Sequence, residues 1–461
     1  MIQLEPIVFY CAIGFGLAFY SARNYGLLPY PTIIIIIFSI SQFMLGMVAS
    51  GNVTFDFLNT FSRNGYIQNY DSVNLIYIVT SIFILALCPR IGETFDFRRA
   101  ILDNSQSIGR IVPVGALLAT GIILASILLV NWPYVFLHFG YMTGASWADA
   151  QDRPLLSLNP VVHRSILFAI TLLTPPMAFL FVIAGNIRSN SRLLRIPIGL
   201  FLVMGYLIAM GGSSRSAAFA PGTVAVAYFL FARDVRAAKV AGFIGLTVIS
   251  LLYTLTARAQ TEQGLLAIPT IMEDIFSSDA GGIAARLFLS FTEGIFVTSE
   301  GIWDTRLYDP AYALLSLSPL PSSIDGFADV RDVGQNRLST YAPMPGVAEL
   351  AQFGIFHSLF VIGLFVIAVK WSFSLQKRSP IIFILTNFLI MFAIYHIFAY
   401  PTRNALRFLW VCFAILGASA LLNPQKKATA LKTKPSVGID PALRARRGLG
   451  LGRSTLKIPP S

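Results

Sequence analysis

Residues 343–354 read Pro-Met-Pro-Gly-Val-Ala-Glu-Leu-Ala-Gln-Phe-Gly, and an apolar run begins directly after them. They close a polar stretch, residues 258–352, that holds 12 of the chain's 22 Asp and Glu residues and no Lys. On each side of this stretch the chain is a succession of hydrophobic runs. We therefore expect those runs to hold 258–352 as one large loop at a membrane face, over a cavity that handles an anionic substrate.

The composition predicts an all-α polytopic membrane protein. Hydrophobic residues make up 55% of the chain and charged residues 12%, with a mean hydropathy of +0.69, whereas soluble domains average about 25% charged residues. A bilayer-spanning helix needs about 20 apolar residues. Eleven runs qualify, with the approximate bounds 6–22, 30–49, 72–88, 111–130, 165–185, 196–212, 216–232, 240–257, 354–370, 380–399 and 406–422. A shorter run, 284–297, carries Arg286 and Glu293 and is predicted to be a re-entrant or surface helix.

The segments between these runs alternate in charge. One set, including the C-terminal segment, holds 23 of the 34 Lys and Arg residues and all eight Lys, while the other set holds 11, all Arg. Because cytoplasmic loops are enriched in Lys and Arg, we expect the N-terminus and 258–352 outside and the C-terminus inside. The formal charge of +12 then reflects topology and contact with anionic lipids, and no nucleic-acid partner is expected. The outer arginines fit either recognition of phosphate and carboxylate or the inward preference of Lys.

This topology divides the chain into four regions. Residues 1–257 are expected to form an N-terminal bundle of eight spans, and 258–353 an extracytoplasmic loop or lid that contains short helices. Residues 354–422 supply three further spans. Residues 423–461 are rich in Lys, Arg, Pro and Gly, which predicts a disordered, basic cytoplasmic tail.

A turn at residues 210–216, Met-Gly-Gly-Ser-Ser-Arg-Ser, lies between two spans on the predicted outer side. The glycines permit a tight bend, so the hydroxyls of Ser213 and Ser214 and backbone N–H groups become available beside Arg215. The next helix begins near Ser216, and its positive end favours an anion such as a phosphate at the same place. The alternative is an ordinary helical hairpin whose Arg reaches the lipid headgroups.

Three more outer arginines are candidate phosphate ligands. Arg258 ends the eighth span and would form a two-Arg clamp for a pyrophosphate with Arg215, or would act only as an anchor at the interface. Arg286 would bind substrate or pair with another charge. Arg403 lies four residues before Arg407, and two such cations repel unless an anion from a lipid or a substrate lies beside them.

Glu349 and His357 are the candidate catalytic residues. Glu349 falls near the first turn of the helix after the Pro-Met-Pro-Gly turn, where the helix dipole favours a carboxylate. His357 follows eight residues later, about two turns deeper on a similar face, so the pair would serve as general base and proton relay. A helix-end charge for Glu349 and a packing role for His357 are the alternatives.

No metal, cofactor or disulfide is expected. Cys11, Cys88 and Cys412 fall within apolar runs, and His138, His163, His357 and His396 are scattered along the chain. Neither pattern has the spacing of a metal site or a disulfide framework.

The layout and motifs resemble those of the oligosaccharide repeat-unit polymerases of bacterial polysaccharide synthesis, the Wzy-type O-antigen polymerases. Three features carry the resemblance, which covers about residues 1–422: the turn Gly211-Gly-Ser-Ser-Arg-Ser216, the span that ends in Arg258, and the exit Pro345-Gly346-x-x-Glu349-x-x-x-Phe353-Gly354. Ser216 stands where Gly is commoner in the family. The related O-antigen ligases use an outer-loop histidine, whereas His357 follows the Phe-Gly motif here.

The resemblance implies a GT-C-like glycosyltransferase fold and a polyprenyl-pyrophosphate-linked oligosaccharide as substrate. It also implies a multi-pass protein of the bacterial cytoplasmic membrane, with flippase and chain-length regulator proteins as partners. Family members use outer-loop arginines to hold the lipid pyrophosphate, a role that corresponds here to Arg215 and Arg258, then to Arg286 and Arg403.

The leading hypothesis is therefore an enzyme that polymerises lipid-linked repeat units at the outer membrane face, with Glu349 as the base. A polysaccharide ligase is the first alternative, because it would use the same kind of donor. A transporter of polysaccharide or lipid-linked sugar is the second, but it would place charges at the centres of spans, and here they lie at helix ends and in loops.

Overall fold

The computed structural model describes residues 4–26, 31–51, 68–88, 105–129, 160–186, 191–211, 215–231, 237–257, 265–277, 287, 292, 294–299, 301–302, 308–320, 326–334, 337–338, 342–376 and 378–422. The chain divides into two compact units, Met1–Leu416 and Gly417–Ser461. In the second unit, the described residues 417–422 form the end of a helix. The account below concerns the first unit.

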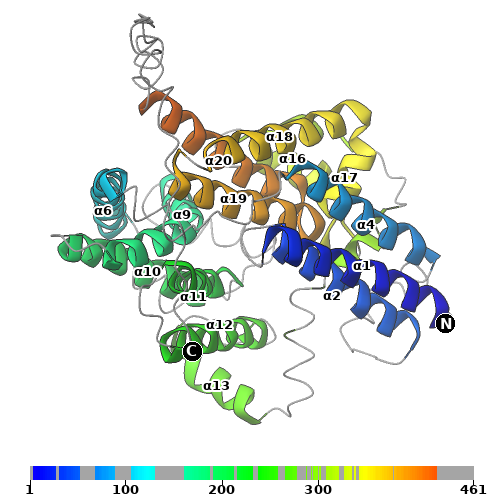
Figure 1. Cartoon of the computed structure of the whole chain (residues 1–461), viewed down its shortest axis with the longest axis horizontal. Coiled ribbons are helices and arrows are strands. Elements are labelled where there is room, and N and C mark those ends of the chain that lie inside the picture. The colour runs from blue at the N-terminus through cyan, green and yellow to red at the C-terminus, as the bar shows by residue number, and fades with distance from the viewer. Residues whose placement is uncertain are drawn as a thin grey trace, which may run out of the picture. The chain divides into compact units, whose positions relative to one another are not determined.

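Eleven helices correspond one to one to the eleven predicted spans (Figure 1). They are α1 (Leu4–Tyr25), α2 (Thr32–Ala49), α4 (Tyr70–Leu87), α6 (Ser105–Leu129), α9 (Pro160–Asn186), α10 (Ser191–Gly211), α11 (Phe219–Phe231), α12 (Ala237–Ala257), α18 (Ile355–Ser374), α19 (Pro380–Ala399) and α20 (Thr402–Leu422). Among the described residues, nine helices are long and apolar enough to cross a membrane, and α9 and α11 contribute the shorter apolar segments Ala169–Gly185 and Phe219–Phe229. The predicted class, a helical multi-pass membrane protein, is confirmed.

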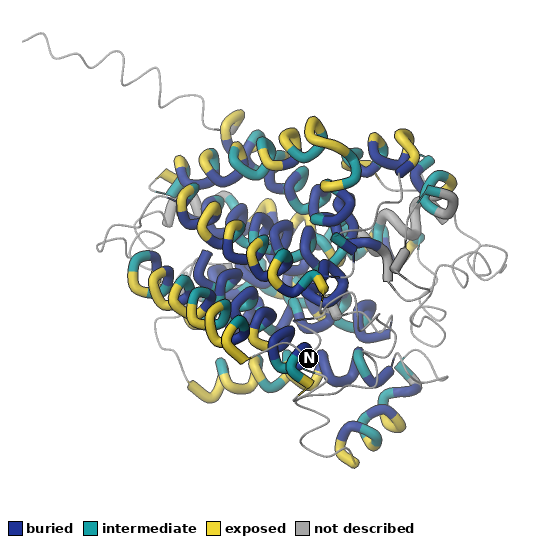
Figure 2. Tube along the Cα trace, turned by 90° about the vertical axis from the view of Figure 1, so that its right-hand side faces the viewer, coloured by how far each residue is buried: buried dark blue, intermediate teal, exposed yellow. Residues whose placement is uncertain are grey.

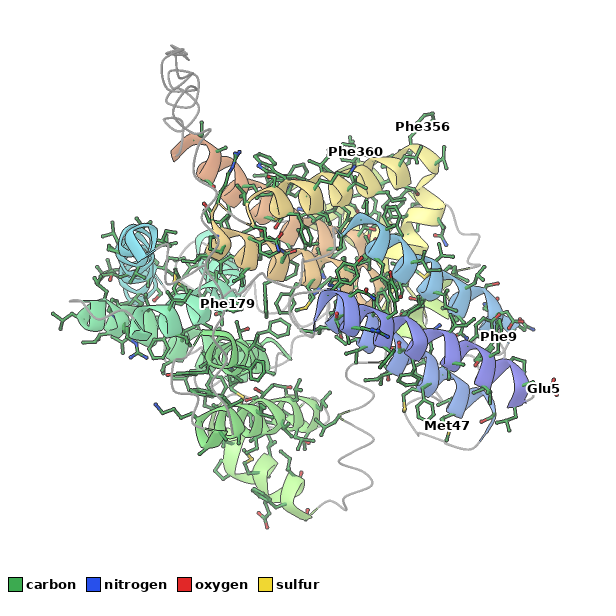
Figure 3. The ribbon with its side chains drawn as sticks, viewed as in Figure 1. Glu5, Phe9, Met47, Phe179, Phe356 and Phe360 are labelled. Atoms are coloured by element: carbon green, nitrogen blue, oxygen red, sulfur yellow. The ribbon has the colours of Figure 1, made fainter. Side chains whose placement is uncertain are left out.

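The spans expose apolar side chains as well as burying them. On α18, Phe356 is 82% exposed and Phe360 47% exposed, and both point away from the neighbouring helices (Figure 3). Figure 2 shows helices that are buried along one side and exposed along the other. Such faces would be unfavourable in water, because each exposed apolar Å² costs about 25 cal/mol relative to burial. Lipid tails in a bilayer remove that cost.

The region between α12 and α18 is built from short elements. They are η4 (Leu265–Ala267), α13 (Ile268–Ser277), α15 (Pro310–Ser316), α16 (Phe327–Gly334), β1 (Arg337–Leu338), β2 (Ala342–Pro343) and α17 (Gly346–Phe353). The two strands pair antiparallel, with Arg337 opposite Pro343 and Leu338 opposite Ala342. The predicted short helices are therefore present in the described residues, and the position of this region outside the membrane stays a prediction.

Residues 294–299, which include the end of the predicted re-entrant or surface helix at 284–297, lie inside the protein, so the surface alternative is wrong for this segment and the re-entrant one stays a prediction. Ile295, Phe296 and Val297 are at most 2% exposed, and the Thr298 hydroxyl donates to the carbonyl oxygen of Phe398 at 3.1 Å. Three consecutive apolar residues leave no polar face to lie against headgroups. Packing against α19 buries them instead.

Three hydrogen bonds connect segments that the alternation of spans places on one side of the membrane. The Asn69 amide donates to the Ser299 carbonyl at 2.7 Å, and the Gly346 N–H donates to the Tyr400 carbonyl at 2.8 Å. The bond between Thr298 and Phe398 is the third. On the opposite side, the Tyr25 hydroxyl lies 3.2 Å from the Cys88 carbonyl. These contacts agree with the predicted alternation, while the assignment of the outer side stays a prediction from charge.

The chain breaks between α17 and α18 at Gly354, where φ is +98°. This left-handed region is accessible to Gly and strained for residues with a Cβ. Glu349 and His357 therefore lie on separate helices, and the expectation that they share a face of one continuous helix is wrong.

Candidate functional site

The exit of the large loop is docked on the turn between α19 and α20. A Cβ atom added at Gly346 would lie 2.9 Å from Cγ1 of Ile397 and 3.0 Å from the backbone N and Cα of Thr402. Only a residue without a side chain allows this approach. Together with the hydrogen bond from Gly346 N–H to the Tyr400 carbonyl, the contact fixes the first turn of α17 against the bundle.

Docking buries the carboxyl group of Glu349 completely, with 0% of the residue exposed. Its Oε1 accepts the Tyr312 hydroxyl hydrogen at 2.7 Å, and its Oε2 accepts the Thr402 backbone N–H at 2.6 Å. Burial raises the pKa of the Glu349 carboxyl from 4.5 to about 7, although the bonds from Tyr312 and Thr402 act in the opposite direction. A carboxyl removed from water favours its neutral form, so Glu349 changes charge near neutral pH.

Arg403, the next residue after Thr402, is also buried, with 2% exposed. Its Nη1 donates to the Leu315 carbonyl, and its Nη2 donates to the Leu320 carbonyl at 2.7 Å. The guanidinium carbon lies 4.0 Å from the centroid of the Phe327 ring. Arg403 thus caps the carbonyl end of α15, where a cation is favoured by the helix dipole, and stacks on α16.

The structure brings Glu349 and Arg403 together, and both hold the loop to the bundle. Neither oxygen of Glu349 reaches solvent, so a proton could leave a substrate for this carboxyl only through Tyr312 or after α15 moves. Likewise, the hydrogen bonds of Arg403 go to loop carbonyls. The geometry gives both residues a structural role, and their predicted catalytic and pyrophosphate-binding roles stay predictions.

His357 lies in the first turn of α18 and is partly exposed. Its ring centroid is 5.9 Å from that of Phe353, which in turn is 6.0 Å from that of Tyr312. Two aromatic rings therefore connect His357 to the hydroxyl that bonds Glu349. These contacts supply no direct proton path between His357 and Glu349.

Of the predicted phosphate ligands, Ser213, Ser214, Arg258 and Arg286 lie outside the described residues. Arg215 begins a short 3-10 helix, η3 (Arg215–Ala218), which leads directly into α11. The first residue of α11, Phe219, packs its ring 4.7 Å from that of Phe392 on α19. Arg215 therefore lies four residues before the α11 residue that contacts Phe392 on α19.

Next to this contact is a partly exposed polar and aromatic face at the turn where the sequence suggested a phosphate beside Arg403 and Arg407, but gave His396 no role of its own. His396 stacks on Tyr400 with ring centroids 4.8 Å apart and contacts the Phe408 ring at 4.7 Å. We name the following residues the His396 face, all of them partly exposed: Tyr395, His396, Tyr400, Asn404, Arg407 and Phe408. The signal in the sequence is the concentration of polar residues around one short turn.

The His396 face differs from the lipid-exposed faces in its chemistry. Many of the exposed side chains of the spans are large and apolar, such as Phe356 and Leu117, which is 75% exposed, and the exposed charged residues Arg23, Asp71 and Lys239 lie near helix ends. Polar and ionisable side chains in membrane spans face the bundle interior or a water-filled cavity, because lipid tails cannot solvate them. The His396 face is therefore the best candidate in the described residues for the wall of a substrate cavity.

Comparisons of the chain with protein-family models, with curated proteins and with solved structures gave no match. Within the described ranges, no group of three or more His, Cys, Asp or Glu side chains is arranged to hold a metal ion.

Proposed function

We propose that this protein is a membrane glycosyltransferase that polymerises polyprenyl-pyrophosphate-linked oligosaccharide repeat units. The observation that carries the proposal is the 4.7 Å contact between Phe219 and Phe392. It brings the helical segment that begins at Arg215 to α19, four residues before His396. A turn that the sequence predicts to bind an anion and a partly exposed polar surface, both at the ends of apolar helices, suit a substrate with a charged head and a lipid tail.

The pyrophosphate would bind at the turn. Backbone N–H groups before α11 and the guanidinium of Arg215 favour a phosphate, with Ser213, Ser214, Arg258 and Arg286 as further ligands. The polyprenyl chain would lie along the apolar helix faces. The negative charge of the pyrophosphate increases as its bond to the sugar breaks. The same arginines therefore stabilise the transition state more than the bound substrate.

The large loop would close the cavity from outside as a lid. Support comes from hydrogen bonds that attach α15 and α17 to the first turn of α20. Glu349 on α17 bonds Thr402, Arg403 bonds the α15 carbonyl of Leu315, and Tyr312 on α15 bonds Glu349. In this proposal the protein lies in the bacterial cytoplasmic membrane with a GT-C-like arrangement. Flippase and chain-length regulator proteins are the expected partners.

Deletion of the gene in its source bacterium, followed by return of wild-type or variant genes, tests the proposal. A polymerase predicts that the deletion strain makes single repeat units in place of long surface polysaccharide, and that Arg215→Ala fails to restore chain length at wild-type protein levels. Long chains that accumulate without attachment to their acceptor would instead identify a ligase. Accumulation of complete lipid-linked units on the cytoplasmic side would identify a transporter.

A further inference from the structure

We propose that His396 is the general base of this reaction, accepting the proton of the attacking sugar hydroxyl through Nε2. The inference rests on the proposed glycosyl transfer and goes beyond it by assigning the proton acceptor. It also replaces Glu349, the first candidate from the sequence, on geometric grounds.

The structure fixes which nitrogen of His396 can accept a proton. Nδ1 lies 2.9 Å from the carbonyl oxygen of Phe392. A carbonyl oxygen only accepts hydrogen bonds, so Nδ1 must carry the hydrogen of the neutral ring. Nε2 then has a lone pair, and in the part of the chain that the structure describes no group donates to it. A histidine held in one tautomer by a backbone carbonyl is a common arrangement for a base.

The surroundings of His396 hold the ring in place while leaving it partly exposed. Tyr400 stacks on one side at 4.8 Å, and Phe408 and Phe392 contact it at 4.7 and 6.5 Å. Asn404 and Arg407 on α20 are also partly exposed. In the proposal, the acceptor hydroxyl approaches Nε2 from this face.

The base also lies at the level where the pyrophosphate is proposed to bind. Phe219 and Phe392 are in contact; Arg215 precedes Phe219 by four residues, and His396 follows Phe392 by four residues. Since α11 begins and α19 ends on this side of the bundle, both residues lie about one helical turn, roughly 6–8 Å along the axes, beyond the aromatic contact. The proposal places the sugar between these two positions.

The competing candidates fit less well. Both oxygens of Glu349 accept protein hydrogen bonds, and the residue is 0% exposed. His357 contacts Phe353 at the start of α18, beside the exposed apolar residues Ile355 and Phe356. His396 combines partial exposure, a fixed tautomer and a polar face.

In the proposed step, the hydroxyl oxygen of the acceptor sugar attacks the anomeric carbon of the donor sugar. The bond from that carbon to the pyrophosphate oxygen breaks, and its electron pair leaves with the polyprenyl pyrophosphate. The acceptor's proton moves to Nε2 of His396, and the imidazolium then returns it to the departing pyrophosphate or to water. Neither a metal nor a redox partner is needed for this balance.

The test uses purified full-length protein in detergent, with lipid-linked repeat units extracted from the source membranes as substrate. His396→Gln and His396→Asn should each lower the elongation rate by 100-fold or more, the range typical for loss of a general base. Asn retains a donor near the position of Nδ1. Binding of farnesyl pyrophosphate, a commercial probe for the anion site, should stay within about threefold of wild type. Imidazole added to His396→Ala should restore part of the rate, which a purely structural role would not allow.

The outcomes separate this inference from the proposed function. Elongation within about threefold of wild type in a folded His396 variant would overturn the inference and leave the polymerase proposal standing, and the same holds if Glu349→Gln or His357→Gln alone abolishes the reaction. A wild-type protein that extends no chain would overturn both. If every His396 variant fails to fold, diethyl pyrocarbonate modification of the wild type decides: activity should fall in step with carbethoxylation of His396, and full activity after its modification would contradict the proposal.

Discussion

The hydroxyl of Tyr312 lies 2.7 Å from Oε1 of Glu349, so α15 and α17 share one buried hydrogen bond although 37 residues separate the two positions. The second carboxylate oxygen bonds the Thr402 N–H. One side chain thus connects two parts of the loop with the first turn of α20. The attachment of the loop is therefore polar, buried and sensitive to single substitutions.

Replacing Tyr312 with Phe should destabilise the protein by about 1–3 kcal/mol. The reason is that Oε1 of Glu349 would lose its hydrogen-bond donor while remaining buried. Thermal unfolding of purified protein in detergent measures the change. Tyr228→Phe on α11 is the matched control, because the Tyr228 ring stacks on Phe243 and its hydroxyl bonds no described residue. Equal melting temperatures for the two variants would contradict the structural role of Tyr312.

Glu349 should make stability depend on pH between about 4.5 and 7. The folded protein holds the proton up to a pKa of about 7, whereas the unfolded chain releases it near 4.5. The protonated carboxyl therefore makes its full contribution to the free energy of unfolding below pH 4.5. This contribution, about 3 kcal/mol, is lost as the pH rises through 7. Glu349→Gln mimics the protonated form, so the free energy of unfolding of this variant should not fall between pH 4.5 and 7 through this group. Parallel pH profiles for the variant and the wild type would refute the assignment.

Gly346→Ala should loosen the docking of α17. The added methyl group would meet the backbone of Thr402 at 3.0 Å, and overpacking of this kind costs about 1–3 kcal/mol. At Gly363, in the middle of α18, an added Cβ meets nothing within 4 Å, so Gly363→Ala should be neutral or slightly stabilising. Limited proteolysis of the loop provides the readout: faster cleavage is expected in Gly346→Ala alone, and equal rates in both variants would count against the docking.

Arg403→Lys separates a structural role from a role in binding pyrophosphate. Lys keeps the charge but loses the planar fork that reaches the Leu315 and Leu320 carbonyls. We expect the melting temperature to fall, by an amount that corresponds to about 2 kcal/mol, while farnesyl pyrophosphate binding by the folded fraction stays near wild type. A binding loss with unchanged stability would restore Arg403 to the substrate site.

The spans could be predicted because their signal is local. An apolar run such as Thr32–Ala49 on α2 has the length of a bilayer crossing, and each of the eleven predicted runs coincides with a helix. The break at Gly354 escaped prediction because a Phe-Gly pair inside a helical pattern does not by itself specify φ > 0. The burial of residues 294–299 depends on α19, about 100 positions later in the chain, and no local pattern reports such a partner.

The candidate site was predictable only in part for the same reason. Glu349 and Arg403 were identified by type and position, but their partners, Tyr312, Thr402 and the α15 carbonyls, are 37 to 88 residues away in sequence. Contacts with those partners bury Glu349 and Arg403 and give them a structural role. His396 gained its significance only when its bond to Phe392 and the neighbouring Phe219 were known.

The most direct test of the central claim is elongation of extracted lipid-linked repeat units by the purified protein, compared with Arg215→Ala and Arg258→Ala. The account predicts a ladder of longer products with the wild type and single units only with either variant, at equal amounts of folded protein. Products of full length from both variants would contradict it.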